Sequence, residues 1–243
     1  MKKPEHAVHR LFQYRKAISS KPFSARGKNL LRCELCLLAQ KHCTCRYRKQ
    51  LNSNASFLLI MYDDEVLKPS NSGRLIADLI PDVRAYIWSR THTNRKILDL
   101  LNHPQYQPFI VFPSEYATES QTVVETLPQK LNQNKKPLFV ILDGSWREAI
   151  KMFRKSPYLH QLPMLSISPE KTAAYTLRKG KRDFQLGTAE VAALVLEVFG
   201  EPENANSLAT WFSLFIESSL LSRSRQSDKD LSKRNSLIQQ FAE

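Results

Sequence analysis

The chain has 243 residues, of which 42% are hydrophobic and 24% are charged, which suits one large globular domain and argues against a disordered protein. Its formal net charge is +13, and residues 1–50 carry +11 of it, with thirteen basic and two acidic side chains. No run of roughly 18 apolar residues and no secretory signal is present, so we expect a cytoplasmic protein without a membrane partner.

The positive charge of residues 1–50 favours a surface that contacts a phosphate backbone. Two other interpretations are a solvated basic tail without a partner and a surface attracted to anionic lipid. The lipid interpretation is weaker, because Val8, Leu11, Phe12 and Ile18 form only a short apolar stripe. Nothing in the sequence implies a stable protein partner.

All four cysteines lie within residues 33–45. Disulfides are rare in the reducing cytosol, and a Cys-x-Cys pair is sterically awkward as a bridge. Two close pairs of thiolates can instead occupy the four corners of a tetrahedral zinc site, closed to water and therefore structural. An iron–sulfur cluster and reactive free thiols remain as alternatives. The expected ligands are Cys33, Cys36, Cys43 and Cys45.

Short apolar runs from residue 57 onward predict buried strands. The runs at 57–61, 84–88, 109–112 and 138–142 are almost continuously apolar, and a fifth strand is predicted at 164–167. Continuous apolarity without alternation is typical of a parallel sheet that is covered on both faces.

Amphipathic stretches between these runs predict helices, and their alternation with strands predicts a doubly wound α/β domain. We divide the chain into a basic segment with the cysteine knuckle (1–52), an α/β domain (53–222) and a polar helix or tail (223–243). The predicted helices are 73–80, 94–101, 116–126, 145–154, 188–199 and 208–221, with one short terminal helix within 231–241.

Ligands of open α/β sheets bind at the carboxyl ends of the strands, where Asp143 follows the run 138–142. Ser145 is a typical N-cap for the next helix, and Trp146 in its first turn would face the same crevice as Asp143. Capping and core packing are the alternative roles of these residues. No two glycines form a Gly-x-Gly nucleotide turn, so a nucleoside would be bound by another route.

Three basic stretches suit RNA, because cations contact phosphates and aromatic rings stack on bases. The first is the loop 70–74, whose hydroxyls, glycine and cation also suit a carboxylate or an ordinary turn. The second is a stripe at helical spacing, and the third mixes an aromatic residue with cations. The candidate RNA-binding residues are Arg74, Arg147, Lys151, Arg154, Tyr175, Arg178, Lys179, Lys181 and Arg182.

Four motifs, taken in order and spacing, resemble the DTW-domain family of tRNA-uridine aminocarboxypropyltransferases. The motifs are the cysteine knuckle, Ser70-Asn71-Ser72-Gly73-Arg74-Leu75, Asp143-Gly144-Ser145-Trp146, and Tyr175-Thr176-Leu177-Arg178 followed by Gly187-Thr188-Ala189-Glu190. The resemblance runs from about residue 32 to residue 215. Ser145 stands where the family usually has threonine, and Tyr62 where many members have histidine.

This resemblance implies a SPOUT-like fold, knotted near its C-terminal half, that binds S-adenosylmethionine in the loops after the strands. It implies that Asp143 is the catalytic base, which accepts a proton from N3 of an unpaired uridine in tRNA while the aminocarboxypropyl group is transferred. A SPOUT-type RNA methyltransferase and a non-catalytic zinc-containing RNA-binding protein are the rival interpretations. The implied cofactor-binding residues are Phe112, Pro113, Leu142, Ser145, Trp146, Leu186, Gly187 and Thr188.

Overall fold

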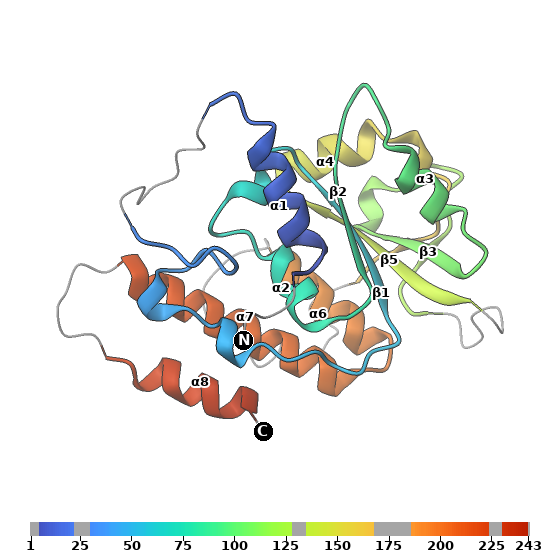
Figure 1. Ribbon diagram of the computed structural model, residues 1–243. Coiled ribbons are helices and arrows are strands. Elements are labelled where there is room, and N and C mark those ends of the chain that lie inside the picture. The colour runs from blue at the N-terminus through green and yellow to red at the C-terminus, as the bar shows by residue number, and fades with distance from the viewer. Residues whose placement is uncertain (1–4, 22–29, 128–134, 168–185, 224–229, 243) are drawn as a thin grey trace.

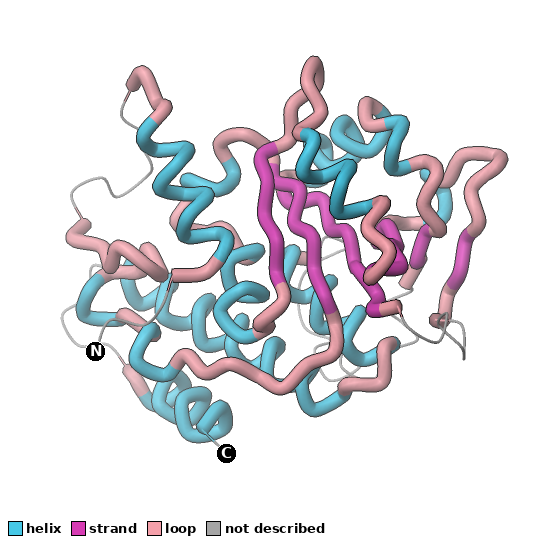
Figure 2. The backbone as a smooth tube through the Cα atoms, turned by 45° about the vertical axis from the view of Figure 1, so that its right-hand side comes forward, coloured by secondary structure: helices cyan, strands magenta, loops and turns pink. Residues whose placement is uncertain are grey.

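Parallel strands form a six-stranded sheet at the centre of the molecule, as Figures 1 and 2 show. The computed structural model describes residues 5–21, 30–127, 135–167, 186–223 and 230–242. Every recorded strand pair is parallel, in the order β2-β1-β5-β3-β6-β4, which confirms the predicted α/β fold. The strands are β1 (Ser56–Met61), β2 (Val83–Ile87), β3 (Tyr106–Val111), β4 (Val123–Val124), β5 (Lys136–Asp143) and β6 (Met164–Leu165).

Helices lie on both sides of this sheet (Figure 2). The α-helices are α1 (Ala7–Ala17), α2 (Gly73–Leu79), α3 (Arg95–Leu101), α4 (Trp146–Arg154), α6 (Thr188–Val198), α7 (Pro202–Arg223) and α8 (Ser232–Ala242). Five 3-10 turns join them in the described residues: η1 (Gln40–His42), η2 (Cys45–Tyr47), η3 (Glu65–Leu67), η4 (Ser114–Tyr116) and η5 (Pro157–Leu159).

Alternate side chains of each strand enter two separate apolar cores. Phe57, Leu59, Phe139 and Ile141 pack toward α2, α6 and α7. Leu58, Ile60, Val140 and Leu142 pack toward α3 and α4. Because both faces are covered, both sets of positions must be apolar, which explains the continuous apolar runs in the sequence.

The predicted helix at 116–126 is wrong. The chain there forms the short turn η4 and then β4, whose Val123 and Val124 pair with Met164 and Leu165 of β6. Gln121 has a buried side chain that donates hydrogen bonds to the carbonyl oxygens of Leu159 (3.1 Å) and Leu162 (2.8 Å). Pairing between distant segments therefore overrides the local preference for a helix.

The basic N-terminal segment contains a helix that the sequence did not predict. In α1, Val8 and His9 are buried, and Leu11 and Phe12 pack against the core on the α2 side of the sheet. The short apolar stripe thus covers this core. No described helix is long and apolar enough to cross a membrane. The knot expected near the C-terminal half stays a prediction, since residues 168–185 of that half lie outside the described part of the chain.

The topology places one strand end at the centre of the molecule. The connection after β1 leads through α2 to β2 on one side, while the chain later crosses to β3 on the other side, and β5 fills the gap between β1 and β3. Open α/β sheets bind ligands in the crevice at such a switch point, beyond the carboxyl ends of the strands. The residue at the carboxyl end of β5 is Asp143.

Candidate active site and metal centre

Asp143 is held by β5 and by the strand beside it. Its register partner on β1 is Met61, and its carbonyl oxygen accepts a hydrogen bond from the backbone N–H of Tyr62 (2.8 Å). At this point β5 is paired with β1 alone, while its earlier part, Lys136 to Val140, is also paired with β3. The direction of the Asp143 side chain is therefore set by the most constrained strand of the sheet.

The carboxylate of Asp143 is 2% exposed and is hydrogen-bonded on both oxygens. Oδ2 accepts from Nδ2 of Asn71 (2.7 Å), and Oδ1 accepts from the hydroxyl of Thr188 at the start of α6. Only glycine fits at position 73, because a Cβ there would lie 3.0 Å from Cγ of Asp143. The carboxylate is more enclosed than the sequence predicted. It connects β5 to α6 and to the loop that precedes α2.

Burial raises the pKa of Asp143 to about 6, because the charged form is poorly solvated there. The hydrogen bonds from Thr188 and Asn71 oppose this increase, and the nearby Glu65 carboxylate adds to it. At neutral pH the group is therefore mostly ionised but holds a proton much more readily than an exposed aspartate. A pKa near the working pH is the property that suits a general base.

The loop before α2 is fixed by further contacts to the same elements. Oδ1 of Asn71 accepts a hydrogen bond from the backbone N–H of Arg74 (3.2 Å), and Oγ of Ser72 accepts one from the backbone N–H of Ala189 (3.4 Å). Asn71 thus bonds its own loop through one atom and Asp143 through another. Sequence analysis did not assign Asn71 a role, although it lies inside the quoted Ser-Asn-Ser-Gly motif.

The helix α4 starts beside Asp143 with a reciprocal cap. Glu148 accepts hydrogen bonds from the backbone N–H (2.7 Å) and the hydroxyl (2.6 Å) of Ser145. Partial burial opposes ionisation of Glu148, but these hydrogen bonds hold its pKa below the usual range. The hydroxyl of Ser145, which we expected to bind the cofactor, is therefore directed into the cap.

Aromatic rings line the other side of the strand end. Trp146 is 38% exposed and stacks on Phe112 (ring centroids 5.5 Å apart, planes at 19°). Tyr116 packs edge-on against both rings, at 5.7 Å from Trp146 and 5.3 Å from Phe112. An exposed indole on a rigid base offers a flat surface for an aromatic or cationic ligand.

A second group of rings is joined to Asp143 through the backbone of Tyr62. Tyr62 stacks on Trp88 (5.8 Å), and Nζ of Lys151 lies 3.2 Å from the Tyr62 hydroxyl and 5.5 Å from the centre of its ring. Arg154, one turn further along α4, lies 6.0 Å from the ring of Tyr116. Cations beside aromatic rings are the combination that binds unpaired nucleotides.

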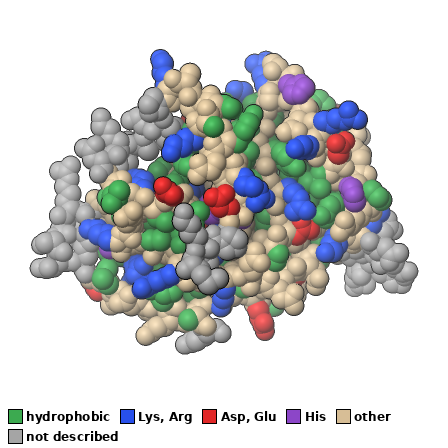
Figure 3. All heavy atoms as spheres, in the orientation of Figure 1, with side chains coloured by type: hydrophobic (Ala, Val, Ile, Leu, Met, Phe, Trp, Pro, Cys, Tyr) green, Lys and Arg blue, Asp and Glu red, His purple; other side chains and the backbone are tan. Residues whose placement is uncertain are grey.

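The predicted cationic stripe on α4 is exposed. Arg147, Lys151 and Arg154 all lie at the surface of this helix. Figure 3 shows Lys and Arg side chains dispersed over one face of the molecule, including its upper part, where α4 lies. Their contact with RNA stays a prediction.

Arg74 does not lie at the surface, so the prediction that it contacts RNA is wrong. Its side chain is 2% exposed and donates hydrogen bonds to the carbonyl oxygens of Leu35 (3.3 Å), Val66 (3.4 Å) and Lys68 (3.1 Å). Burial lowers its pKa, while Asp78 and other nearby negative charges oppose the decrease. The guanidinium thus connects the cysteine segment to the loop that holds Asn71.

The remaining predicted residues fall into two groups. Leu186, Gly187 and Thr188 lie at the start of α6, where the Gly187 N–H donates to Glu190 (2.8 Å), and Pro113 follows Phe112 directly. Leu142 is buried in the core toward α3 and α4. The structure brings together Asp143, Thr188 and Gly187 on one side and Phe112 and Trp146 on the other. Tyr175, Arg178, Lys179, Lys181 and Arg182 lie outside the described residues.

The four cysteines converge on one point. Sγ of Cys33 lies 3.7 Å from Sγ of Cys45, Sγ of Cys36 lies 3.7 Å from Sγ of Cys43, and the four sulfurs lie within 4.8 Å of one another. A tetrahedron with Zn–S bonds of about 2.3 Å has sulfurs about 3.8 Å apart. The donor set therefore fits a four-coordinate structural metal ion.

The thiols also affect one another electrostatically. Hydrogen bonds from Cys36 and Cys45 lower the pKa of Cys33, while hydrogen bonding to Cys33 raises the pKa of Cys36 and of Cys45. A second thiolate beside the first is disfavoured unless a cation neutralises the charge. Crowding four thiols in this way is costly without a metal ion.

The cysteine knuckle, residues 33–45, is built into the fold. Cys36 and Leu38 are buried in the core that includes α2, α6 and α7, and the carbonyl oxygen of Cys43 accepts a hydrogen bond from Arg234 of α8 (3.4 Å). Leu37 adopts a φ of 58°, a left-handed conformation that surrounding structure must hold in place. The site is therefore part of the core and is not an appendage.

One comparison with known proteins gives a match. A family model described as DTW domain matches residues 30–220, which include the cysteine knuckle, the whole sheet, Asp143 and Thr188. No solved structure matches the chain.

Proposed function

Since the chain belongs to the DTW domain family, which is associated with tRNA-modifying enzymes, we propose that it is an aminocarboxypropyltransferase acting on tRNA. The group would come from S-adenosylmethionine and would be transferred to N3 of an unpaired uridine. The observation that carries this proposal is the carboxylate of Asp143, whose pKa is raised to about 6 at the switch point of the sheet.

Uridine N3 is a poor nucleophile while it keeps its proton. In the proposed step Asp143 accepts that proton, N3 forms a bond to the carbon next to the sulfonium, and the carbon–sulfur bond breaks. The electron pair of that bond leaves with sulfur, so the second product is neutral methylthioadenosine. Both charges, the sulfonium and the carboxylate, are neutralised in the same step.

The described residues fit such a ligand pair. S-adenosylmethionine would supply the electrophilic carbon, and its adenine and sulfonium suit the exposed face of Trp146 stacked on Phe112. Tyr62, which stacks on the buried Trp88, and Lys151 offer a ring and a cation for the tRNA on the other side of Asp143. Glu148 remains ionised at neutral pH and adds negative potential near the sulfonium.

The fixed contacts of Asp143 assign a positioning role to two neighbours. Asn71 and Thr188 hold the carboxylate in one orientation, and their hydrogen bonds stabilise its ionised form. The base would therefore be kept ionised and in a fixed orientation until the substrate reaches it. We also propose that the metal at Cys33, Cys36, Cys43 and Cys45 is a zinc ion with a structural role only.

The reaction is tested by following label into RNA. The protein is incubated with total tRNA and with S-adenosylmethionine labelled separately in the methyl carbon and in the carboxyl carbon. Carboxyl label in tRNA, together with equimolar methylthioadenosine, supports the proposal. Methyl label would instead identify a methyltransferase, and absence of both would support a non-catalytic RNA-binding protein.

The pH dependence of this reaction should follow Asp143. The base must be ionised, so kcat/KM should fall about tenfold for each pH unit below its pKa of about 6 and level off above it. Replacing Thr188 by valine removes a hydrogen bond that lowers this pKa. In Thr188→Val the acid limb should therefore move from about pH 6 toward about pH 7.

The measurement is the pH profile of kcat/KM for both proteins, taken at tRNA concentrations well below KM. Thr188→Ser retains the hydroxyl and should keep the wild-type profile. An acid limb that stays in place in Thr188→Val would mean that another group controls it.

A further inference from the structure

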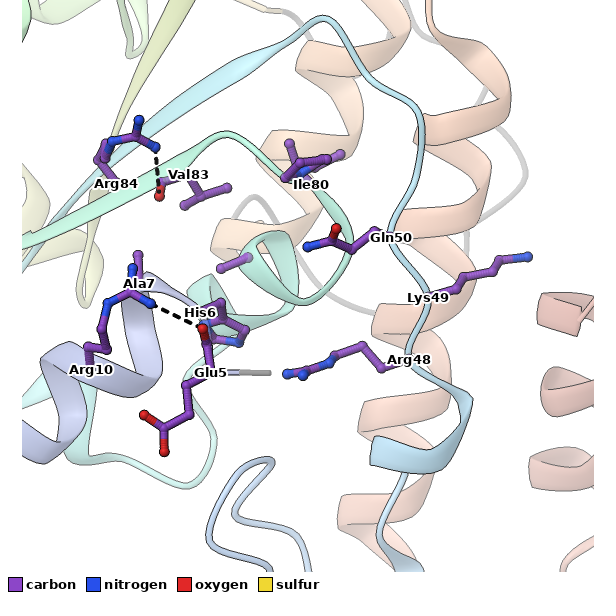
Figure 4. A pocket seen from close by; sticks show the side chains of 12 residues that line it. Glu5, His6, Ala7, Arg10, Arg48, Lys49, Gln50, Ile80, Val83 and Arg84 are labelled. Carbon is purple, nitrogen blue, oxygen red and sulfur yellow. Dashed lines mark hydrogen bonds between the residues drawn. The ribbon is translucent and has the colours of Figure 1, made fainter. Parts of the chain in front are cut away.

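A cavity of about 480 Å³ lies at the amino end of β2, away from Asp143 at the carboxyl end of β5. It is formed by the start of α1, the segment after η2, and the turn from α2 into β2 (Figure 4). Val83 is the first residue of β2, so this cavity lies at the amino end of the strands, whereas Asp143 ends β5 at the carboxyl edge. The cavity is thus separate from the proposed active site.

Cations dominate the charged lining of the cavity. Arg10, Arg48, Lys49 and Arg84 line it, against one acidic residue, Glu5. Figure 4 shows that Glu5 directs its carboxylate away from Arg48 and Arg84. Lys49 points outward as well, and its ammonium donates to the carbonyl oxygen of Phe241 (2.7 Å). Three arginines therefore carry the positive charge that lines the cavity.

Arg48 is anchored by a buried network. Its side chain is 6% exposed, and Nη1 donates to Oδ1 of Asp78 (3.2 Å). The other oxygen of Asp78 accepts from the indole N–H of Trp211 (3.1 Å), and Oδ1 also contacts Nε2 of His6 (3.2 Å). The guanidinium of Arg48 is therefore fixed in the wall of the cavity by its ion pair with Asp78.

Arg84 and Arg10 complete the lining. Arg84 is 45% exposed and is oriented by Asp82 (2.7 Å), which in turn accepts hydrogen bonds from Ser56 and Tyr106. Arg10 donates from Nη1 to the carbonyl oxygen of Glu5 (3.1 Å). A guanidinium has five N–H donors, so the contacts of Arg10 and Arg84 leave donors for a ligand on these two side chains.

The histidines beside the cavity do not form a metal site with Asp78. His6 and His9 stack face to face, with ring centroids 3.5 Å apart and planes at 18°. Lone pairs that lie in two parallel planes cannot converge on one ion. The two rings instead exchange backbone hydrogen bonds at the start of α1 and hold Asp78 in place.

The rest of the lining is apolar or neutral. Ala77, Ile80, Pro81 and Val83 form the apolar part, and the amide of Gln50 lies among them. We infer that this cavity binds a phosphate-bearing nucleotide, with the phosphate against the arginines and the sugar or base against the apolar residues. Backbone nucleotides of tRNA are the source that the proposed function favours, and this identification rests on that function. A free nucleotide has the same chemistry.

The test uses the full-length, metal-loaded protein and the double variant Arg10→Gln/Arg84→Gln. Its matched control is Lys96→Gln/Lys233→Gln, which removes two exposed cations that lie outside residues 1–50 and do not line the cavity. Affinity for total tRNA is measured over a range of NaCl concentrations. The cavity variant should bind about tenfold more weakly, with a salt slope smaller by about 1.5, because two phosphate contacts are lost. The control should change less than about twofold at the same salt.

A second arm titrates wild-type protein and the cavity variant with AMP and with inorganic phosphate. Saturable AMP binding that the variant loses, with tRNA affinity unchanged, would assign the cavity to a free nucleotide. Unchanged tRNA affinity and no AMP binding by the wild type would overturn the inference. Arg10→Lys/Arg84→Lys keeps both charges and should restore the salt slope.

These outcomes are independent of the transfer reaction. Loss of tRNA affinity in the cavity variant without any label transfer by the wild type would retain this site and reject the proposed function. Label transfer by the wild type, with identical tRNA affinities in all variants, would support the proposed function and reject this site.

Discussion

Replacing Asp143 by asparagine should lower the rate of transfer about 100- to 10,000-fold while leaving the protein folded, because the amide cannot accept the proton from N3. The buried surroundings can accept the change. The amide oxygen can still accept from Asn71, and the hydroxyl of Thr188 can rotate to accept from the new amide N–H. The substitution also removes a charge whose burial opposes folding.

The measurement is single-turnover transfer of carboxyl label at pH 8, where wild-type Asp143 is ionised. Asp63→Asn is the matched control, since Asp63 is an exposed aspartate one residue beyond Tyr62 and pairs only with Arg15 in the described structure. Its rate should stay within about twofold of the wild type. Near wild-type rates in Asp143→Asn would show that the carboxylate only fastens the surrounding loops.

Loss of the metal should destabilise the whole protein, since the knuckle lies in the core. Cys36→Ser should bind no metal, and the free energy of unfolding should fall by about 5 kcal/mol, which lowers Tm by roughly 10–20 °C. The buried position of Cys36, at 4% exposure, makes this larger than the effect expected for a surface zinc loop. Metal analysis of the purified wild type should give one zinc per chain.

Lys41→Ala is the control, because Lys41 is exposed within the same loop and contributes no sulfur. It should keep one zinc and the wild-type Tm. Iron with visible absorbance would identify a cluster in place of zinc, and a chelator-treated protein with an unchanged Tm would mean that the site needs no metal.

Local pattern predicted the fold well wherever the core alone decides the structure. The strands β1, β2 and β5 begin and end within two residues of the apolar runs, because only residues buried on both faces give such runs. The same reasoning failed at 116–126, where Val123 and Val124 pair with a strand forty residues later. No local signal contains that partner.

The site was predicted less completely, and the errors concern polar residues. Arg74 was interpreted as a surface cation because arginine in a Ser-Asn-Ser-Gly turn suits anion binding, whereas backbone carbonyls bury it. Asp78 was missed, although an acid within the apolar run Leu75-Ile76-Ala77-Asp78-Leu79-Ile80 indicates a buried network. The sequence alone shows which groups are polar, but it does not show which partners the fold brings to them.

The position of β5 divides the proposed reaction centre into an immobile half and an adjustable half. A strand that is hydrogen-bonded on both sides is among the last parts of a protein to exchange its amide hydrogens. Asp143 is the last residue of such a strand and is paired with β1. Asn71 lies instead in the loop before α2, and Thr188 is the first residue of α6; loops and helix ends open more readily than a central strand. Entry of a pyrimidine would thus require the side chains of Asn71 and Thr188 to move away from the Asp143 carboxylate, which itself stays in place. This opening step, and not proton transfer, would then limit the rate of turnover.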